Sequence, residues 1–411
     1  MCLITGNIAP IQRLHPKIGG FKDADTLIGF DKDAFRSYGK EQGANAPTSE
    51  AAAFRYGAAL NRMLDRGSRN RLHRTVGDAT VAFWADTSGT ISEAEAAAAE
   101  NAFVWFADPP GRAEDDDDDR QEAAKLREAL EKVAAGRPVE ELGLGIRSGT
   151  RFHVLGLSPN AARLSVRYWL DDTFEVFARR LADHYRDLNV APLPRGWGVK
   201  PPSIQRLLVK TTALQEKFDN IPPLLAGEVM RALLSGAPYP RTLLIPAIMR
   251  LRAGDDPRSG WHAAAIKACL NRSARSEKEK LPVALEPDRE DRAYQLGRLF
   301  AVLESAQYAA LGRVNAPIGD RYYAAASSTP ARVFGTLLRG LKNHVADARK
   351  RGQGGWIEPK VAEIVAKLPP DLPLTLRLEE QGRFAIGYYH ERATRPAKRT
   401  AENNENGGDQ E

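Results

Sequence analysis

The chain has 411 residues, of which 43% are hydrophobic and 27% charged, and it carries a formal net charge of +6. This length allows two or three domains, each with its own core, and the only two cysteines, Cys2 and Cys269, exclude a disulfide framework. Neither a signal peptide nor an apolar run of membrane-spanning length is visible, so we expect a cytoplasmic protein that has no membrane partner.

The first 194 residues alternate between strand-like and helix-like patterns, which predicts an α+β portion. Strand-forming residues gather in four segments: 2–5, 26–31, 75–86 and 151–172. The third is a strand or a hairpin, and the last is a predicted β-hairpin that turns at Ser158-Pro159-Asn160. Helical spacing recurs in four others: 48–67, 92–108, 119–136 and 171–188. We expect Thr48 or Ser49 to cap the first of these helices, and Asp172 or Thr173 the last.

The stretch "PPGRAEDDDDDRQ" interrupts this portion and contains the acidic linker 109–119. Like charges repel one another and keep such a run extended. One hypothesis is a site for a metal ion or a basic partner. We favour the alternative, an exposed loop whose acidic end complements the N-terminal dipole of the following helix.

Residues 195–392 are predicted to be all-α, after four prolines and two glycines within 189–203 mark a change in composition. Apolar residues spaced three or four apart recur in seven segments: 203–218, 222–235, 240–253, 259–275, 289–312, 329–350 and 358–368. The polar stretch 393–411 is predicted to be a disordered tail. The expected fold class is therefore α+β: a mixed α/β N-terminal portion followed by an all-α helical bundle.

A search for catalytic motifs finds none: the patterns GxxxxGK[ST], HExxH, GxSxG and GxGxxG are all absent. Asp183-His184 could belong to a metal-dependent nuclease, but it lies in mid-helix without a histidine cluster, which favours a solvated or internally bonded pair. Cys2 and His15 lack the second pair of ligands that a metal site needs. We expect no enzymatic activity, no cofactor and no metal.

Three segments combine cations with glycines or aromatic rings, as a groove for a nucleic-acid backbone requires: 38–50, 66–74 and 312–330. Residues 195–352 also hold 26 Lys and Arg against 14 Asp and Glu, an excess that suits a polyanion. The candidate nucleic-acid-binding residues are Lys40, Gln42, Asn45, Arg66, Arg69, Arg71, His73, Arg74, Arg206, Lys210, Arg313, Asn315, Arg321 and Tyr322. The alternative is a solvated helical surface, with Tyr322 or Tyr323 in the core.

Six strings occur in an order that is typical of one family. They are "CLITG…RLHPKIGG", "SYGKEQGANAPTSEAAAFRYGAALN", "FHVLGLSPNAARLSVRYWLDDTF", "LGRLFAVLESAQ", "DRYYAAASSTPARVF" and "QGRFAIGYYHER". From Cys2 to Arg392 the chain closely resembles the large subunit of the type I-C (Dvulg-subtype) CRISPR Cascade interference complex. In that family a further domain precedes the first string, so we expect the chain to correspond to the C-terminal two-thirds of such a subunit.

The resemblance implies a non-enzymatic, DNA-binding role in a crRNA-guided complex of antiviral defence. The subunit would support recognition of the target duplex, R-loop formation and stabilisation of the displaced strand, while guide pairing reads the sequence. The implied partners are crRNA-bound Cascade backbone subunits, crRNA, target double-stranded DNA with its displaced single strand, and a recruited helicase–nuclease. The family also makes its C-terminal region separately as a small subunit, which here would need an internal start such as Val283.

Two other classes of function remain as alternatives. A purely structural scaffold would touch only protein subunits and make no DNA contact. A nuclease or helicase of the same defence system would need clustered metal ligands or a phosphate-binding loop, and neither is visible in the sequence.

Overall fold

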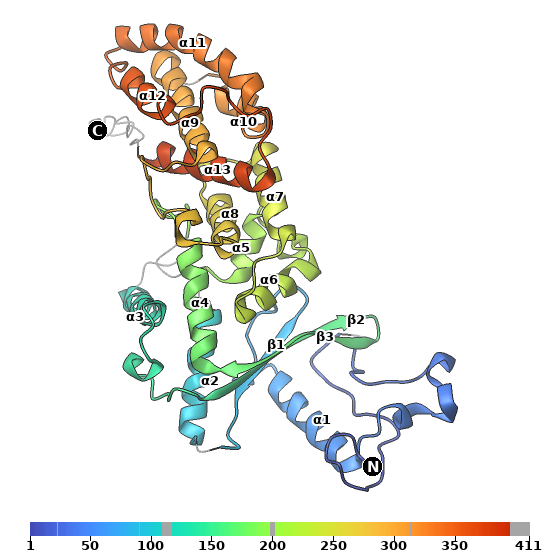
Figure 1. The fold of residues 1–411 in the computed structure, drawn as a ribbon. Helices are drawn as coiled ribbons and strands as arrows, with labels where there is room; N and C mark the ends of the chain where they lie inside the picture. Colours follow the sequence, from blue (N-terminus) through green and yellow to red (C-terminus); the bar gives the residue numbers. More distant parts are fainter. Residues whose placement is uncertain (23, 90, 109–116, 198–201, 313, 395–411) are drawn as a thin grey trace, which may run out of the picture. The chain divides into compact units, whose positions relative to one another are not determined.

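The computed structural model describes all residues except 23, 90, 109–116, 198–201, 313 and 395–411 (Figure 1). The described residues form two compact units. The first comprises Met1–Asp187 and Trp197–Leu243, and the second comprises Leu188–Gly196 and the residues from Leu244 onward. Most of the predicted acidic linker, at 109–116, and the predicted tail from residue 395 lie outside the described residues. The domain division predicted at residue 195 stays a prediction.

The first unit contains a three-stranded antiparallel sheet in the order β1-β2-β3. Its strands are β1 (Thr80–Ala85), β2 (Arg151–Asn160) and β3 (Arg163–Thr173). Its α-helices are α1 (Glu50–Leu64), α2 (Glu93–Ala107), α3 (Asp117–Ala134), α4 (Phe174–Leu188), α5 (Ile204–Lys210) and α6 (Pro223–Ser235). Its 3-10 helices are η1 (Asp33–Phe35), η2 (Ser37–Gly39), η3 (Gln42–Asn45), η4 (Val139–Leu142) and η5 (Phe218–Asn220).

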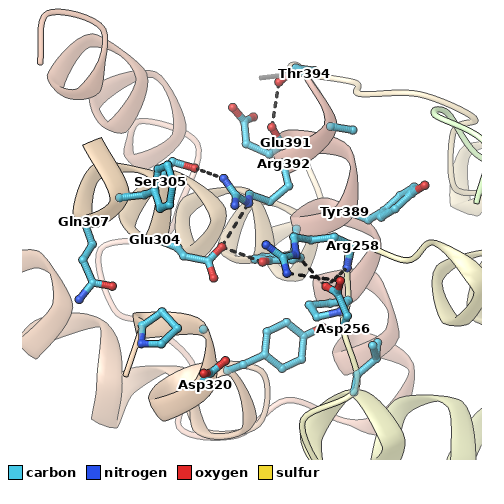
Figure 2. A pocket seen from close by; sticks show the side chains of 18 of the residues that line it. Asp256, Arg258, Glu304, Ser305, Gln307, Asp320, Tyr389, Glu391, Arg392 and Thr394 are labelled. Atoms are coloured by element: carbon cyan, nitrogen blue, oxygen red, sulfur yellow. Dashed lines mark hydrogen bonds and ion pairs between the residues drawn. The ribbon is translucent and has the colours of Figure 1, made fainter. Parts of the chain in front are cut away.

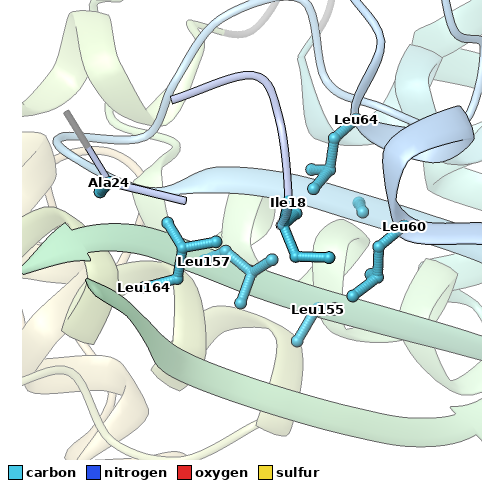
Figure 3. Close-up of a cluster of buried hydrophobic side chains, with 8 residues drawn as sticks. Ile18, Ala24, Leu60, Leu64, Leu155, Leu157 and Leu164 are labelled. Carbon is cyan, nitrogen blue, oxygen red and sulfur yellow. The ribbon is translucent and has the colours of Figure 1, made fainter. Parts of the chain in front are cut away.

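Alternation along the strands gives the sheet two packed faces. On one face, Leu60 and Leu64 of α1 pack with Ile18 against Leu155 and Leu157 of β2 (Figure 3). A fully buried leucine stabilises a fold by about 1.5–3 kcal/mol, so this cluster fixes α1 on the sheet.

The other face of the sheet carries an aromatic core. Phe83 of β1 lies 4.8 Å from Phe103 of α2 between ring centroids, and Phe152 of β2 lies 6.0 Å from Phe177 of α4. All four rings are buried. The sheet is therefore held between α1 on one face and α2 with α4 on the other.

The second unit is helical. Its helices are α7 (Arg241–Arg252, of which the residues from Leu244 belong here), α8 (Trp261–Arg272), α9 (Arg292–Leu311), α10 (Ile318–Ala326), α11 (Pro330–Lys350), α12 (Ile357–Val365) and α13 (Leu378–Ala393), with the 3-10 helix η6 (Glu277–Glu279). At its centre α9 packs against α13, while α10, α11 and α12 contact α9, and α8 contacts α13.

The fold class predicted from the sequence is confirmed: α+β, with a helical C-terminal part. The predicted helix at 48–67 is present with Ser49 as its N-cap, whose hydroxyl accepts a hydrogen bond from the Ala52 amide at 3.3 Å. The hairpin at 151–172 is also present. Its turn falls at Ala161 and Ala162 rather than at 158–160, because strand pairing continues to Asn160 opposite Arg163.

Two predicted strands are wrong. Residues 2–5 form a turn, since the Cys2 amide donates to the Asn7 carbonyl and the Gly6 amide to the Cys2 carbonyl, leaving Leu3 66% exposed. Within 26–31, strand-like pairing is limited to Thr26, which forms isolated β-bridges with Lys17 and Arg163. The apolar residues of 2–5 lie in a local turn, and Leu27 packs beside the leucine cluster under α1 instead of joining the sheet.

The predicted helical segments of the second portion are present within a few residues of their expected ends, apart from 203–218, where α5 ends at Lys210. Two helices were missed. α10 lies inside 312–330, which glycines and polar residues marked as a loop, and α13 follows a proline-rich stretch. Within the described part of the chain, none of the helices combines the length and apolar character of a membrane span.

Candidate nucleic-acid interface

Residues 66–74 follow the C-terminal end of α1 and run along the outer edge of β1. The Leu72 amide donates to the Val81 carbonyl at 3.0 Å, and the Phe83 amide donates to the Asn70 carbonyl at 2.9 Å. Arg71 Nη1 also donates to the Leu64 carbonyl at 2.9 Å, where the last turn of α1 needs a partner. This backbone pairing holds the segment, so that its remaining basic side chains project from a defined edge.

The predicted residues in this segment divide into two groups. Arg71 is half-buried and bonded to α1, which gives it a structural role. The others are exposed: Arg66, Arg69, His73 and Arg74. Of these, Arg69 Nε lies 3.0 Å from Oε2 of Glu100, whose side chain is only 5% exposed.

His73 and Arg74 lie close to Asp108, at the end of α2. Burial raises the pKa of the Asp108 carboxyl, and the positive charges of Arg74 and His73 oppose that rise. The edge segment thus presents a run of cations with buried or half-buried carboxylates behind them. Such a surface can contact phosphate oxygens without specifying a base sequence.

The loop 38–50 holds three predicted residues, of which one is exposed. Gln42 is half-buried and has φ +44°, and its backbone carbonyl accepts from Asn45 Nδ2 at 3.2 Å, so the Asn45 side chain belongs to the local turn. A Cβ at Gly43 would lie 1.9 Å from the Gln12 carbonyl oxygen, so this turn requires glycine. Lys40 is exposed.

Tyr38, in the same loop, was not among the predicted residues. Its side chain is 98% exposed and its φ is +58°, a left-handed conformation that a non-glycine residue adopts at a cost of about 1 kcal/mol. The signal available in the sequence was the aromatic–glycine pair Tyr38-Gly39 between two cationic residues.

On α5, the predicted residues Arg206 and Lys210 are half-buried. Lys210 Nζ donates to the Gln215 carbonyl at 3.1 Å, which ties the end of the helix to the following turn. Lys210 is therefore directed toward its own chain, unlike the exposed Lys40 and Arg66.

In the second unit, the predicted residues Arg321 and Tyr322 lie on α10 and Asn315 precedes it, while Arg313 lies outside the described residues. The Arg321 guanidinium lies 5.8 Å from the centroid of the Tyr322 ring, and Arg321 and Asn315 are both exposed. Tyr323 is a core residue, as the alternative interpretation held for one of the two tyrosines.

The second unit also contains a cavity of about 1370 Å³ that is open to solvent (Figure 2). Asn315 lines it, together with Arg258, Glu304, Tyr389 and Arg392. Of the described residues that line the cavity, five are basic (Arg195, Arg252, Arg258, Lys360 and Arg392), and five are acidic (Asp255, Asp256, Glu304, Asp320 and Glu391).

The charges in this cavity are largely paired with one another. Glu304 Oε2 accepts from the Tyr388 hydroxyl at 2.7 Å and lies 3.3 Å from Arg392 Nε, while Arg258 Nε donates to Asp256 at 2.8 Å. Burial, reinforced by the charge of Glu304, raises the pKa of Tyr388. The described lining residues therefore carry no excess of positive charge that would select a phosphate group.

Three residues that the sequence offered as candidate metal ligands, Cys2, His15 and His184, have local hydrogen-bond partners. Cys2 Sγ accepts from the Ser49 amide at 3.2 Å, His15 Nδ1 lies 2.7 Å from the Tyr56 hydroxyl, and buried His184 is hydrogen-bonded to Tyr239. Among the described residues, no three His, Cys, Asp or Glu side chains are grouped as a metal ion would need.

Residues 1–395 match the model of a protein family described as CRISPR-associated. Since this match covers nearly the whole chain, the protein belongs to that family, Cas_Csd1. A search of curated proteins found no match.

Proposed function

We propose that this CRISPR-associated protein is a non-catalytic, DNA-binding large subunit of a crRNA-guided type I-C surveillance complex. It would support recognition of the target duplex, R-loop formation and stabilisation of the displaced strand. Its partners would be crRNA-bound Cascade backbone subunits, crRNA, target DNA and a separate recruited helicase–nuclease. Base pairing with the guide would read the sequence, leaving backbone contacts to the protein.

The part of this proposal that concerns DNA binding depends on the exposed cations of segment 66–74. Backbone hydrogen bonds of Asn70 and Leu72 to β1 hold the backbone of the segment, so its exposed arginines are carried on a defined edge. A backbone that is already held loses less entropy on meeting phosphate than a free loop does, and each phosphate contact releases counterions. Arg66 and Arg74 are the best candidates, because Arg71 is used by α1 and Arg69 lies beside Glu100.

DNA binding can be tested with matched double variants of the full chain. Arg66→Ala/Arg74→Ala removes two exposed charges from the edge segment, whereas Lys125→Ala/Arg137→Ala removes two exposed charges elsewhere in the first unit. Loss of two phosphate contacts should reduce the slope of log K against log salt by about 2. Fluorescence anisotropy with a labelled duplex should show this change for the first variant only. An equal slope in both variants contradicts a contact at 66–74.

Incorporation into the complex requires a second experiment. The chain would be co-expressed with the other type I-C subunits and crRNA, and the product measured by native mass spectrometry. One copy in a complex whose DNA affinity depends on Arg66 and Arg74 supports the proposal. One copy in a complex whose DNA affinity ignores both residues supports a scaffold instead.

A further inference from the structure

A row of aromatic rings crosses the sheet of the first unit. Trp84 on β1 is in register with His153 on β2, and Trp169 on β3 is paired with Leu155, two residues further along β2. The ring centroids of Trp84 and His153 are 5.2 Å apart, those of His153 and Trp169 5.6 Å, and those of Trp84 and Trp169 5.5 Å. His153 and Trp169 are stacked, with an interplanar angle of 22°.

The row lies where the leucine cluster under α1 ends. Leu155 and Leu157 of β2 are buried beneath Leu60 and Leu64, whereas Trp169 is 51% exposed and Trp84 is partly exposed. The His153 ring lies between the two indoles and contacts both, and its side chain is only 14% exposed. The sheet therefore presents to solvent an indole whose orientation is fixed by two neighbouring rings.

Cations flank this aromatic row. Arg71, which is bonded to the Leu64 carbonyl, is in register with Ala82, two residues before Trp84 on the same strand. Arg69, two residues earlier in the chain, is 59% exposed and is paired with Glu100. Beyond His153 on the same face of β2, Arg151 is also 59% exposed and its Nη2 donates to Asp171 at 2.6 Å. The aromatic row thus continues into the basic edge segment described above.

We infer that the row Trp84–His153–Trp169 is a stacking surface for unpaired bases of a single nucleic-acid strand. A half-exposed indole offers a flat apolar face of the kind on which any base can stack, and the exposed Arg66 and Arg74 of the adjoining edge segment can meet the strand's phosphates. Bases within a duplex are already stacked on one another, so this surface selects single strand. The inference rests on the proposed function and adds that the bound nucleic acid is single-stranded and that it lies on this row of the sheet.

The test uses the full chain and a fluorescein-labelled oligothymidylate of about 15 nucleotides, a length within the range of known single-strand sites. Trp169→Ala should raise the Kd about tenfold, the loss expected for one stacked base, and Trp169→Phe should retain most of the affinity. The matched control is Phe54→Ala, which removes an aromatic side chain that is 75% exposed on α1. A duplex of equal length should compete poorly.

A second measurement needs no variant. Photo-cross-linking of the wild-type chain to the same oligonucleotide carrying 5-iodouracil should place the adduct, by mass spectrometry, on Trp169 or Trp84. Repeating the measurement with an oligouridylate distinguishes binding of a guide RNA strand from binding of a displaced DNA strand. Cross-linking at Trp169 or Trp84 by either oligonucleotide supports the stacking surface.

The failing outcomes are separable. An unchanged Kd for Trp169→Ala, with cross-links elsewhere, overturns the stacking surface and leaves the proposed function standing. Failure of the wild-type chain to bind any of the oligonucleotides or the duplex overturns both.

Discussion

Gly297 of α9 and Gly387 of α13 lie at the point where these two helices cross, and each is in contact with the backbone of the other helix. A Cβ at Gly297 would lie 2.0 Å from the Phe384 carbonyl oxygen, and a Cβ at Gly387 would lie 2.0 Å from the Tyr294 carbonyl oxygen. Real Cβ atoms do not come so close to oxygen, so the crossing distance depends on both residues being glycine.

The first prediction concerns this crossing. Gly297→Ala or Gly387→Ala should destabilise the chain by about 3 kcal/mol, because the new methyl group meets backbone that cannot move aside. The matched control is Gly340→Ala on α11, where a Cβ would meet nothing within 4 Å and higher helix propensity should stabilise by about 0.5–1 kcal/mol. Thermal unfolding followed by circular dichroism measures both; equal melting temperatures for the two kinds of variant would contradict the close crossing.

The second prediction concerns the buried ion pair between the same two helices. Arg298 is completely buried, and its Nε donates to Glu391 at 3.0 Å and its Nη2 to Glu363 at 2.8 Å. Glu391→Leu should cost about 3–5 kcal/mol, since it leaves a buried guanidinium without the carboxylate that is buried with it. The double variant Arg298→Met/Glu391→Leu should recover much of this loss in urea unfolding. If the double variant is no more stable than Glu391→Leu, the buried charge is not the cause.

The third prediction concerns acid pH. Burial lowers the pKa of His262 to about 4, with Asp255 opposing and Arg250 reinforcing the shift. Burial, with the charges of Lys267 and Arg289, lowers the pKa of His390 to about 4. Each histidine is neutral in the folded chain at pH 5 but takes up a proton on unfolding, so each contributes stability that is present above its unfolded pKa of about 6.5 and is lost toward pH 4.

The free energy of unfolding should therefore fall by up to about 1.4 kcal/mol per pH unit for each histidine between pH 6.5 and 4. His262→Leu should reduce this slope in urea unfolding at pH 7 and pH 5. The control is Phe54→Leu, at an exposed and non-titratable position on α1, which should leave the slope as in the wild type. A slope that His262→Leu does not change would mean that this side chain is protonated in the folded chain.

The fourth prediction separates Arg71 from its neighbours in the edge segment. Arg71→Ala should destabilise the chain by about 1.5 kcal/mol, because the Leu64 carbonyl loses a charged hydrogen-bond donor. Arg66→Ala, at an exposed position, should change stability by less than about 0.5 kcal/mol. Chemical denaturation measures both variants, and an equal effect would remove the distinction between a structural and a ligand-facing arginine.

Much of the fold could be predicted because its signals are local. The caps at Ser49 and Thr173 and the alternation of β2 and β3 depend on residues close in sequence, and these elements lie near their predicted positions. α13 was missed because its pattern is not amphipathic: it is buried almost all round between α8 and α9, so its apolar spacing carries no clear period.

The candidate site was less predictable, because whether a cation reaches solvent depends on distant residues. Arg66 and Arg71 are equivalent in the sequence, and only the position of the Leu64 carbonyl makes one of them structural. The row of Trp84, His153 and Trp169 depends on strand register across 86 residues of sequence, so no local pattern reveals it.

The chain passes between the two units more than once, and this limits how the coding sequence can be divided. Leu188–Gly196 belongs to the second unit but is joined at both ends to the first. It is held by hydrogen bonds from the Tyr389 hydroxyl to the Pro192 carbonyl at 2.7 Å and from Trp261 Nε1 to the Arg195 carbonyl at 2.8 Å. A product translated from Val283 would keep the crossing of α9 and α13 but would lack this segment and α8. Neither unit is encoded by one uninterrupted stretch of the gene, so a single cut in the reading frame cannot yield both units whole.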